Sequence, residues 1–205
     1  DKEKLEVIYR NANRMNYLIN ELLTFSKIEM KQMRISVRKG DIMHFLEELS
    51  HIFDIVAGER EIDLIVNLED TEEEVWFSPS KLERILYNLL SNAFKYTQPG
   101  GYVKLSAKLI KEEKGTFVQI SVKDNGRGIP KEAQEQIFES YYQVEKRDHR
   151  EGFGLGLSLT RSLIHMHKGE IRVESEINKG SDFIVTLNVS EDAYNPDERS
   201  SENIT

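Results

Sequence analysis

The stretch NLLSNAFKYT, residues 88–97, forms the second half of a predicted helix and carries an unusual set of polar side chains. Asn88, Asn92 and Lys95 stand at positions i, i+4 and i+7, so they share one stripe of that helix, with Tyr96 beside them. Asparagine is a poor helix former, and a half-buried amide needs hydrogen-bond partners. Bonds to neighbouring backbone would satisfy both amides, but Lys95 one turn further on favours an anionic ligand.

The helix that holds this stretch has clear start and stop signals. Ser78-Pro79 combines an N-cap residue with proline at the first helical position, and Gln98-Pro99-Gly100-Gly101 ends the helix near Thr97. Its broad apolar side consists of Leu82, Ile85, Leu86, Leu89, Leu90, Ala93 and Phe94.

A second polar feature ends a predicted strand. Val118, Ile120 and Val122 alternate with polar residues, so Asp124 points to the same, core-facing side as they do. A carboxylate buried there needs a hydrogen-bond donor, and an exocyclic amine would serve. In the following turn, residues 125–130, Gly126 and Gly128 would let a flat ring approach the backbone. An ordinary turn capped by Asp124 is the alternative.

A third feature is the glycine cluster Gly152-Phe153-Gly154-Leu155-Gly156-Leu157, which precedes a predicted helix. Glycines at a helix N-terminus leave backbone N–H groups open to a phosphate. The spacing differs from the dinucleotide-binding G-x-G-x-x-G pattern, and the preceding residues 144–151 form a charged loop instead of a strand, so a Rossmann fold is excluded.

The segment between Gly128 and Gly152 is too long to be a simple connection. It contains a short predicted helix, Lys131–Phe138, followed by Tyr141-Tyr142-Gln143. A long glycine-bounded loop in a compact domain is usually functional, which predicts a lid.

The rest of the chain predicts a mixed sheet with helices on one face. Residues 1–31 read as a long helix whose apolar seam needs partner helices, unless it packs on its own domain. The seam consists of Leu5, Ile8, Ala12, Met15, Ile19 and Leu22. Strands are expected at 34–37, 62–68, 102–109 and 117–124, helices at 42–57 and 155–167, and a hairpin pairing 170–176 with 182–189. Polar, aperiodic residues 191–205 predict a disordered tail or linker.

Composition narrows the function classes. The chain has 205 residues, a net charge of −8 and no cysteine. The acidic balance disfavours a nucleic-acid partner, and the absence of cysteine excludes disulfides and thiolate metal sites. No apolar run approaches the roughly 20 residues that a membrane span needs, so no membrane contact is expected within the chain.

The ordered motifs resemble those of sensor histidine kinases, relatives of DNA gyrase and the heat-shock ATPase chaperones. Residues 88–97 are similar to the N box, 124–130 to the G1 box, 137–143 to the F box and 152–157 to the G2 box. Residues 10–15 and 22–29 resemble the second helix of the dimerisation and phosphotransfer hairpin. The motifs are especially similar to those of hybrid two-component kinases of the Bacteroides type. The resemblance implies an α+β two-layer sandwich, the Bergerat ATP-binding fold, preceded by a long helix.

The resemblance also implies roles for the motif residues and the cofactors ATP and Mg²⁺. Asn92 would be the Mg²⁺ ligand, with Asn88 helping to hold metal or phosphates, and Lys95 would meet a phosphate; Asn92 and Lys95 are the expected catalytic residues. Phe138 would anchor the lid, and Arg147 or Arg150 would reach the γ-phosphate. The expected nucleotide contacts are Asn88, Asn92, Lys95, Tyr96, Asp124, Gly126, Gly128, Ile129, Phe138, Gly152, Gly154, Leu155, Gly156 and Leu157.

Two departures from the family pattern stand out. Family members usually have Asp where this chain has Ser78, which can still cap the helix. None of the five histidines has phosphoacceptor surroundings, and His165 and His167, at a helix end, favour solvent or helix-dipole roles. The phosphoacceptor histidine is therefore expected on a helix preceding Asp1.

The resulting domain prediction is a partial dimerisation domain at 1–31, an ATP-binding catalytic domain at 32–190 and a tail at 191–205. The expected partners are a second copy through the N-terminal helix and a response-regulator receiver domain. We expect a cytoplasmic location in an inner-membrane sensor.

Two other functions remain open at this point. The gyrase and chaperone ATPases resemble the same helix but place a glutamate general base at position 88, where asparagine cannot accept a proton. The third possibility is a nucleotide-binding interaction module without phosphotransfer, because the phosphoacceptor lies outside these residues.

Overall fold

The computed structural model describes residues 32–71, 73–142 and 154–200, together with residues 9, 12, 15, 19, 22–24, 26–28 and 30 of the N-terminal segment. One five-stranded sheet runs through the domain in the order β2-β4-β5-β7-β6. Its strands are β2 (Asp63–Leu68), β4 (Tyr102–Glu112), β5 (Gly115–Asp124), β6 (Glu170–Glu176) and β7 (Gly180–Asn188). β2 pairs with β4 in parallel and the other neighbours are antiparallel, so the expected mixed sheet is confirmed.

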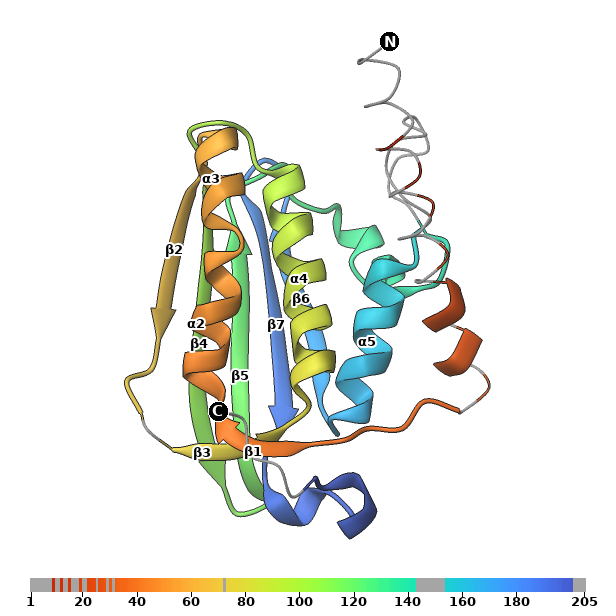
Figure 1. The fold of residues 1–205 in the computed structure, drawn as a ribbon. Helices are drawn as coiled ribbons and strands as arrows, with labels where there is room; N and C mark the ends of the chain where they lie inside the picture. The colour runs from red at the N-terminus through yellow and green to blue at the C-terminus, as the bar shows by residue number, and fades with distance from the viewer. Residues whose placement is uncertain are drawn as a thin grey trace.

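Helices cover one face of this sheet, as Figure 1 shows. They are α2 (Ile42–His51), α3 (Asp54–Arg60), α4 (Pro79–Tyr96) and α5 (Gly156–Met166). The predicted apolar side of α4 is buried along its whole length and forms one continuous core with alternate residues of β4, β5 and β7. The α+β two-layer sandwich is therefore confirmed.

α4 begins and ends at its predicted signals, but its cap differs in detail. Ser78 occupies the N-cap and Pro79 the first helical position, yet the Ser78 hydroxyl makes no capping bond. The Ser78 carbonyl instead accepts the N–H of Leu82 at 2.9 Å. The helix closes at Thr97, whose hydroxyl donates to the Ala93 carbonyl at 2.8 Å.

The region before α4 differs from the sequence prediction at three points. The first strand, β1 (Arg38–Asp41), begins after the predicted 34–37 and pairs with an unpredicted strand, β3 (Glu74–Phe77). The predicted helix 42–57 is broken between α2 and α3 because the chain turns Phe53 inward. Phe53 is buried and stacks on Phe94 of α4 at a centroid distance of 5.6 Å.

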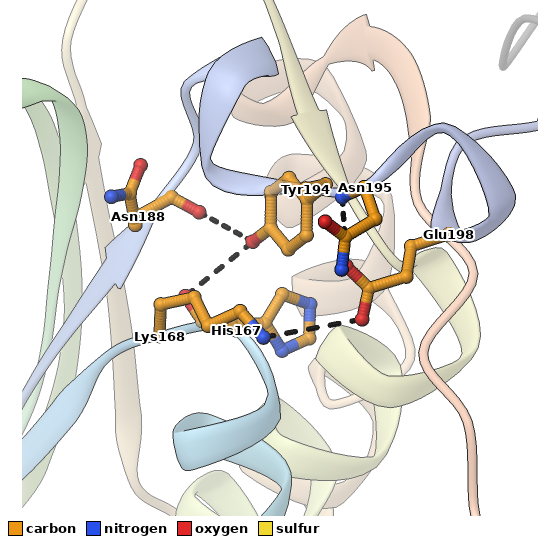
Figure 2. Close-up of polar contacts among 6 residues, drawn as sticks. All are labelled: His167, Lys168, Asn188, Tyr194, Asn195 and Glu198. Carbon is orange, nitrogen blue, oxygen red and sulfur yellow. Dashed lines mark hydrogen bonds and ion pairs between the residues drawn. The ribbon is translucent and has the colours of Figure 1, made fainter.

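Residues 191–200 are ordered, which corrects the prediction of a disordered tail across them; residues 201–205 lie outside the described residues. Short 3-10 helices occupy Glu191–Ala193 and Pro196–Glu198, and we call residues 191–200 the C-terminal strap. Tyr194 is buried, and Figure 2 shows its hydroxyl donating to the backbone carbonyls of Asn188 at 2.5 Å and His167 at 3.4 Å. The polar composition did not reveal this order, because the strap is held by one buried aromatic side chain and by backbone hydrogen bonds.

The strap also holds the segment that leads into β1. The Val37 N–H donates to the Glu198 carbonyl at 2.8 Å, and the Ser200 N–H donates to the Val37 carbonyl at 2.9 Å. Ile35, Val37 and Tyr194 form a small apolar cluster separate from the main core. The strap thus pairs with the linker between the N-terminal helix and the domain.

His167 is fully buried beside the strap, so the expected solvent-exposed or helix-dipole role is wrong for it. Its Nε2 accepts the Ser78 N–H at 3.2 Å, which leaves Nδ1–H to donate to the Leu163 carbonyl at 3.0 Å. Both ring nitrogens are therefore used by the neutral form. Burial lowers the pKa of His167 to about 4.

The N-terminal segment is helical at every described position from 9 to 28. Tyr9, Met15, Ile19 and Leu22 expose between 50% and 72% of their surface, so this part of the seam is uncovered in the single chain. Ile28, nearer the domain, packs against the main core. Near the end of the segment the Arg84 side chain donates to the Thr24 hydroxyl at 2.8 Å. Within the described residues, no helix is both long and apolar enough to cross a membrane.

Candidate functional site

Three chain segments that are distant in sequence meet at one end of the sheet. They are the second half of α4, the turn that follows β5 and the first turn of α5; α4 and α5 lie side by side over the sheet (Figure 1). The predicted N-box, G1-box and G2-box residues that the structure describes therefore occupy one neighbourhood.

Asp124 ends β5 and points inward, as the strand alternation predicted. It follows Val118, Ile120 and Val122 on the buried side of the strand and is itself 5% exposed. Its Oδ1 accepts the Gly126 N–H at 2.8 Å. Burial raises the pKa of Asp124, against the hydrogen bonds from the Gly126 and Ser181 backbone, which lower it. A carboxylate held this way can accept a further hydrogen bond from a ligand amine.

Gly126 and Gly128, in the turn after β5, are required because protein backbone lies close to them. The sequence prediction had given another reason, the close approach of a flat ring. A Cβ on Gly126 would lie 2.4 Å from the Tyr96 carbonyl oxygen, and one on Gly128 would lie 2.0 Å from the Glu176 carbonyl oxygen. Gly128 also has φ +70°, which disfavours other residues. These glycines dock the turn onto the end of α4 and onto the β6–β7 hairpin, and so fix the position of Asp124. Beside them the Ile129 N–H donates to the Ser175 hydroxyl at 2.8 Å.

Asn88 lies against the first turn of α5. Its Nδ2 donates to the Thr160 hydroxyl at 2.8 Å. A Cβ on Gly156 would lie 2.6 Å from the Asn88 Oδ1, so only glycine leaves room for this amide. The partner of Asn88 is thus a side chain of the neighbouring helix, and the alternative of bonds to neighbouring backbone is not what the structure shows.

Asn92, Lys95 and Tyr96 continue the stripe toward the end of α4, and all three are half-buried. Lys95 Nζ lies 4.8 Å from the centre of the Tyr96 ring, and the Arg127 guanidinium lies 4.3 Å from it. The two cations give this end of the site a positive potential. Arg127 was not among the residues predicted for the site, although its position between Gly126 and Gly128 was a signal.

The segment before α5 is described from Gly154 onward. Gly154 has φ +70°, and a Cβ there would lie 2.6 Å from the Tyr142 carbonyl oxygen; the Tyr141 N–H donates to the Gly154 carbonyl at 3.0 Å. Leu155 is buried and Leu157 packs against the core. The predicted contact Gly152 and the two arginines proposed for the γ-phosphate, Arg147 and Arg150, lie outside the described residues.

Phe138 lies in the main core. It belongs to the 3-10 helix Gln136–Phe138 and packs edge-on against Phe183 of β7 at a centroid distance of 6.3 Å. The predicted helix 131–138 is resolved into this turn and a second 3-10 turn, Lys131–Ala133. Phe138 therefore holds the beginning of the predicted lid segment onto the sheet.

The chemistry that this arrangement supports is binding of an anionic ligand with an amine-bearing ring. The site joins an inward carboxylate, two amides, two cations near an aromatic ring and a helix N-terminus. Among the described residues, no cluster of three or more His, Asp or Glu side chains could hold a metal alone. The donor set instead fits Mg²⁺, which takes few protein ligands and completes its shell with phosphate oxygens and water.

Comparisons with known proteins point the same way. Residues 77–191 match the family described as histidine kinase-, DNA gyrase B-, and HSP90-like ATPase. The chain is 34% identical to histidine kinase P4 of Formosa agariphila over 190 residues, which cover 90% of this chain and 14% of that protein. It is also 34% identical to the sensor histidine kinase WalK of Bacillus subtilis, covering 92% of this chain and 31% of that one. The chain thus spans a minor part of these curated relatives.

Solved structures share the fold. The catalytic domain of histidine kinase ThkA superposes with a TM-score of 0.67 at 25% identity, covering 78% of this chain and all of that one. Full-length ShkA, solved in complex with AMPPNP, gives a TM-score of 0.81 at 24% identity, covering 92% of this chain and 39% of that one.

Proposed function

This chain belongs to the family of histidine kinase-, DNA gyrase B- and HSP90-like ATPases, and on that premise we propose that it transfers the γ-phosphoryl group of ATP to a protein histidine. Residues 77–191 are an ATP-binding domain of this family. The observation that carries the proposal is the convergence of Asp124, the α4 amides and the α5 N-terminus at one end of the sheet.

Each part of the site has a place in this function. The Asp124 carboxylate accepts a hydrogen bond from the adenine amine, while Gly126 and Gly128 hold the turn that positions it. Tyr96 packs beside the nucleotide, and Ile129 and Leu157 line its apolar surroundings. Lys95 and the open N–H groups at the start of α5, around Gly154 and Gly156, bind the phosphate tail.

Asn92 would hold Mg²⁺, with Asn88 beside it. When bound, Mg²⁺ supplies charge neutralisation on the phosphate oxygens. The residues of the chain contribute positioning and charge stabilisation, because phosphoryl transfer needs little covalent chemistry from the protein.

Asn88 favours phosphotransfer over steady ATP hydrolysis. An amide cannot accept a proton, so it cannot act as the general base that activates water. Its Nδ2 is already committed to Thr160. An incoming histidine imidazole is itself a nucleophile and needs no such base.

The exposed apolar side chains of the N-terminal helix support a proposal about its partners. Tyr9, Met15, Ile19 and Leu22 expose half or more of their surface, which favours a helix-to-helix contact with a second copy and with a helix preceding Asp1. That preceding helix would hold the phosphoacceptor histidine, and a response-regulator receiver domain would take the phosphoryl group onward. The parent protein would be a membrane sensor whose cytoplasmic part includes this chain.

The test extends the chain at its N-terminus with the segment that precedes Asp1 in its gene. With γ-labelled ATP and Mg²⁺, the extended protein should take up label that is lost in acid and kept in alkali, as expected for phosphohistidine. Replacing the histidine of the added helix by glutamine should abolish the label. Acid-stable label on serine or threonine, or ATP hydrolysis without labelling, would contradict the proposal.

A further inference from the structure

We propose that Thr160 is a positioning residue for the reaction: its hydroxyl orients the Asn88 amide so that Oδ1 faces the metal and phosphate end of the nucleotide. The inference rests on the proposed function. It assigns a role to a side chain of α5 that lies outside all four motifs.

The contact joins two helices at a partly buried point. Asn88 Nδ2 donates to Thr160 Oγ1 at 2.8 Å across the α4–α5 interface, and Thr160 is 1% exposed. Gly156 stands one helical turn before Thr160, and its Cα lies next to the Asn88 Oδ1, as the 2.6 Å separation from a built Cβ shows. The amide therefore spans the first turn of α5, with its nitrogen on Thr160 and its oxygen over Gly156.

Electrostatics select this orientation over the reverse. The first turn of a helix presents unpaired N–H groups and the positive end of the helix dipole. The amide oxygen is favoured there, and the amide nitrogen is favoured one turn deeper, where a hydroxyl oxygen can accept. Without the hydroxyl, the half-buried Asn88 amide would lose its acceptor and would rotate toward another.

A rotated Asn88 amide should weaken magnesium-dependent binding in particular. Oxygen is the ligand atom that Mg²⁺ requires, so an amide turned the wrong way presents a hydrogen-bond donor in its place. Groups that orient a ligand side chain typically change metal affinity about 10- to 100-fold when removed. Recognition of the adenine ring, at Asp124, would not depend on this orientation.

The test compares three single substitutions on α5 in the full chain. Thr160→Val keeps the shape and removes the hydroxyl, and Thr160→Ser keeps the hydroxyl. Ser162→Ala is the matched control, because the Ser162 hydroxyl donates to the Ser158 carbonyl at 3.0 Å on the same helix. Calorimetry measures the affinity for a non-hydrolysable ATP analogue at saturating Mg²⁺ and in excess EDTA.

Thr160→Val should weaken binding about tenfold with Mg²⁺ and should change it less than about threefold in EDTA. Thr160→Ser and Ser162→Ala should stay near the wild-type values in both conditions. Equal affinities of Thr160→Val and wild type with Mg²⁺ would overturn the inference. So would an equal loss in both conditions, or a loss in Thr160→Ser as large as in Thr160→Val, since either would indicate a packing role. A wild-type chain that binds no analogue in either condition would instead overturn the proposed function itself.

Discussion

Gly156 and Gly126 are both crowded positions of the site, but a side chain would meet different atoms at each. Alanine substitutions should therefore have different effects at the two positions. A Cβ on Gly156 would meet the tip of the Asn88 side chain at 2.6 Å, which can move. A Cβ on Gly126 would meet the Tyr96 backbone carbonyl at 2.4 Å, which is held by α4 and cannot easily move. The first glycine serves the ligand, in our account, and the second serves the fold.

Gly156→Ala is accordingly expected to preserve folding and to impair binding. The free energy of unfolding should change by less than about 1 kcal/mol, since alanine is also the better helix former. Affinity for a magnesium-bound ATP analogue should fall about tenfold because Asn88 is displaced. Gly126→Ala should lower the free energy of unfolding by about 1–3 kcal/mol. Urea titrations and calorimetry measure the two quantities, and equal destabilisation by both substitutions would contradict the distinction.

His167 makes stability dependent on pH. Its pKa is lowered from 6.5 to about 4 in the folded chain by burial, so between these values the unfolded chain binds more protons. The stabilisation is complete above pH 6.5 and is lost as the pH falls toward about 4, with a total of about 3 kcal/mol. His167→Gln, which keeps an acceptor for the Ser78 N–H, should show a smaller loss between pH 7.5 and 4.5. Parallel stability curves for the two proteins in urea would refute this assignment.

At the scale of elements, the C-terminal strap is held by one aromatic side chain and a pair of backbone hydrogen bonds to Val37. It lies at the opposite end of the sheet from the candidate site, next to β1 and β3 (Figure 1). Because the strap bonds to Val37, the segment that joins the N-terminal helix to the domain depends on Glu198 and Ser200, more than 160 positions later in the chain.

Tyr194→Ala should release this linker. The substitution removes a buried ring and its hydrogen bonds to Asn188 and His167, at a cost of roughly 3–5 kcal/mol by analogy with other buried aromatic residues. The Val37 amide, bonded to the Glu198 carbonyl, should exchange with deuterium at least tenfold faster. Asp192→Ala, at an exposed strap position, is the control. Unchanged exchange at Val37 in Tyr194→Ala would show that the strap does not hold the linker.

Helices and strands that several local sequence signals indicate together were predicted correctly. Those that depend on one contact with a residue far away in the sequence were not. α4 combined a cap, a proline, an apolar side and a glycine stop, and both ends were correct. β3 was missed because its four residues follow an acidic run and become a strand only by pairing with β1. The break between α2 and α3 depends on the packing of Phe53 against Phe94, 41 positions later. The local spacing of apolar residues carries no information about such a distant contact.

At the scale of the whole molecule, the sheet order brings the separate motifs together. β5 lies at the centre of the sheet, so its end at Asp124 lies under the junction of α4 and α5. The residue types and their order in the sequence were enough to predict a nucleotide site. The Thr160–Asn88 bond and the backbone contacts of Gly126 and Gly128 were not predictable, because each depends on how two elements pack in space.

The most direct measurement of the central claim is calorimetric titration of the chain with a non-hydrolysable ATP analogue. The wild type should bind with Mg²⁺, and Asp124→Ala should weaken binding at least about tenfold with or without the metal, since a charge-assisted bond contributes about 1.5–3 kcal/mol. Asn92→Ala should weaken it only when Mg²⁺ is present. Affinity unaltered in both variants would contradict the assignment of this end of the sheet as the ATP site.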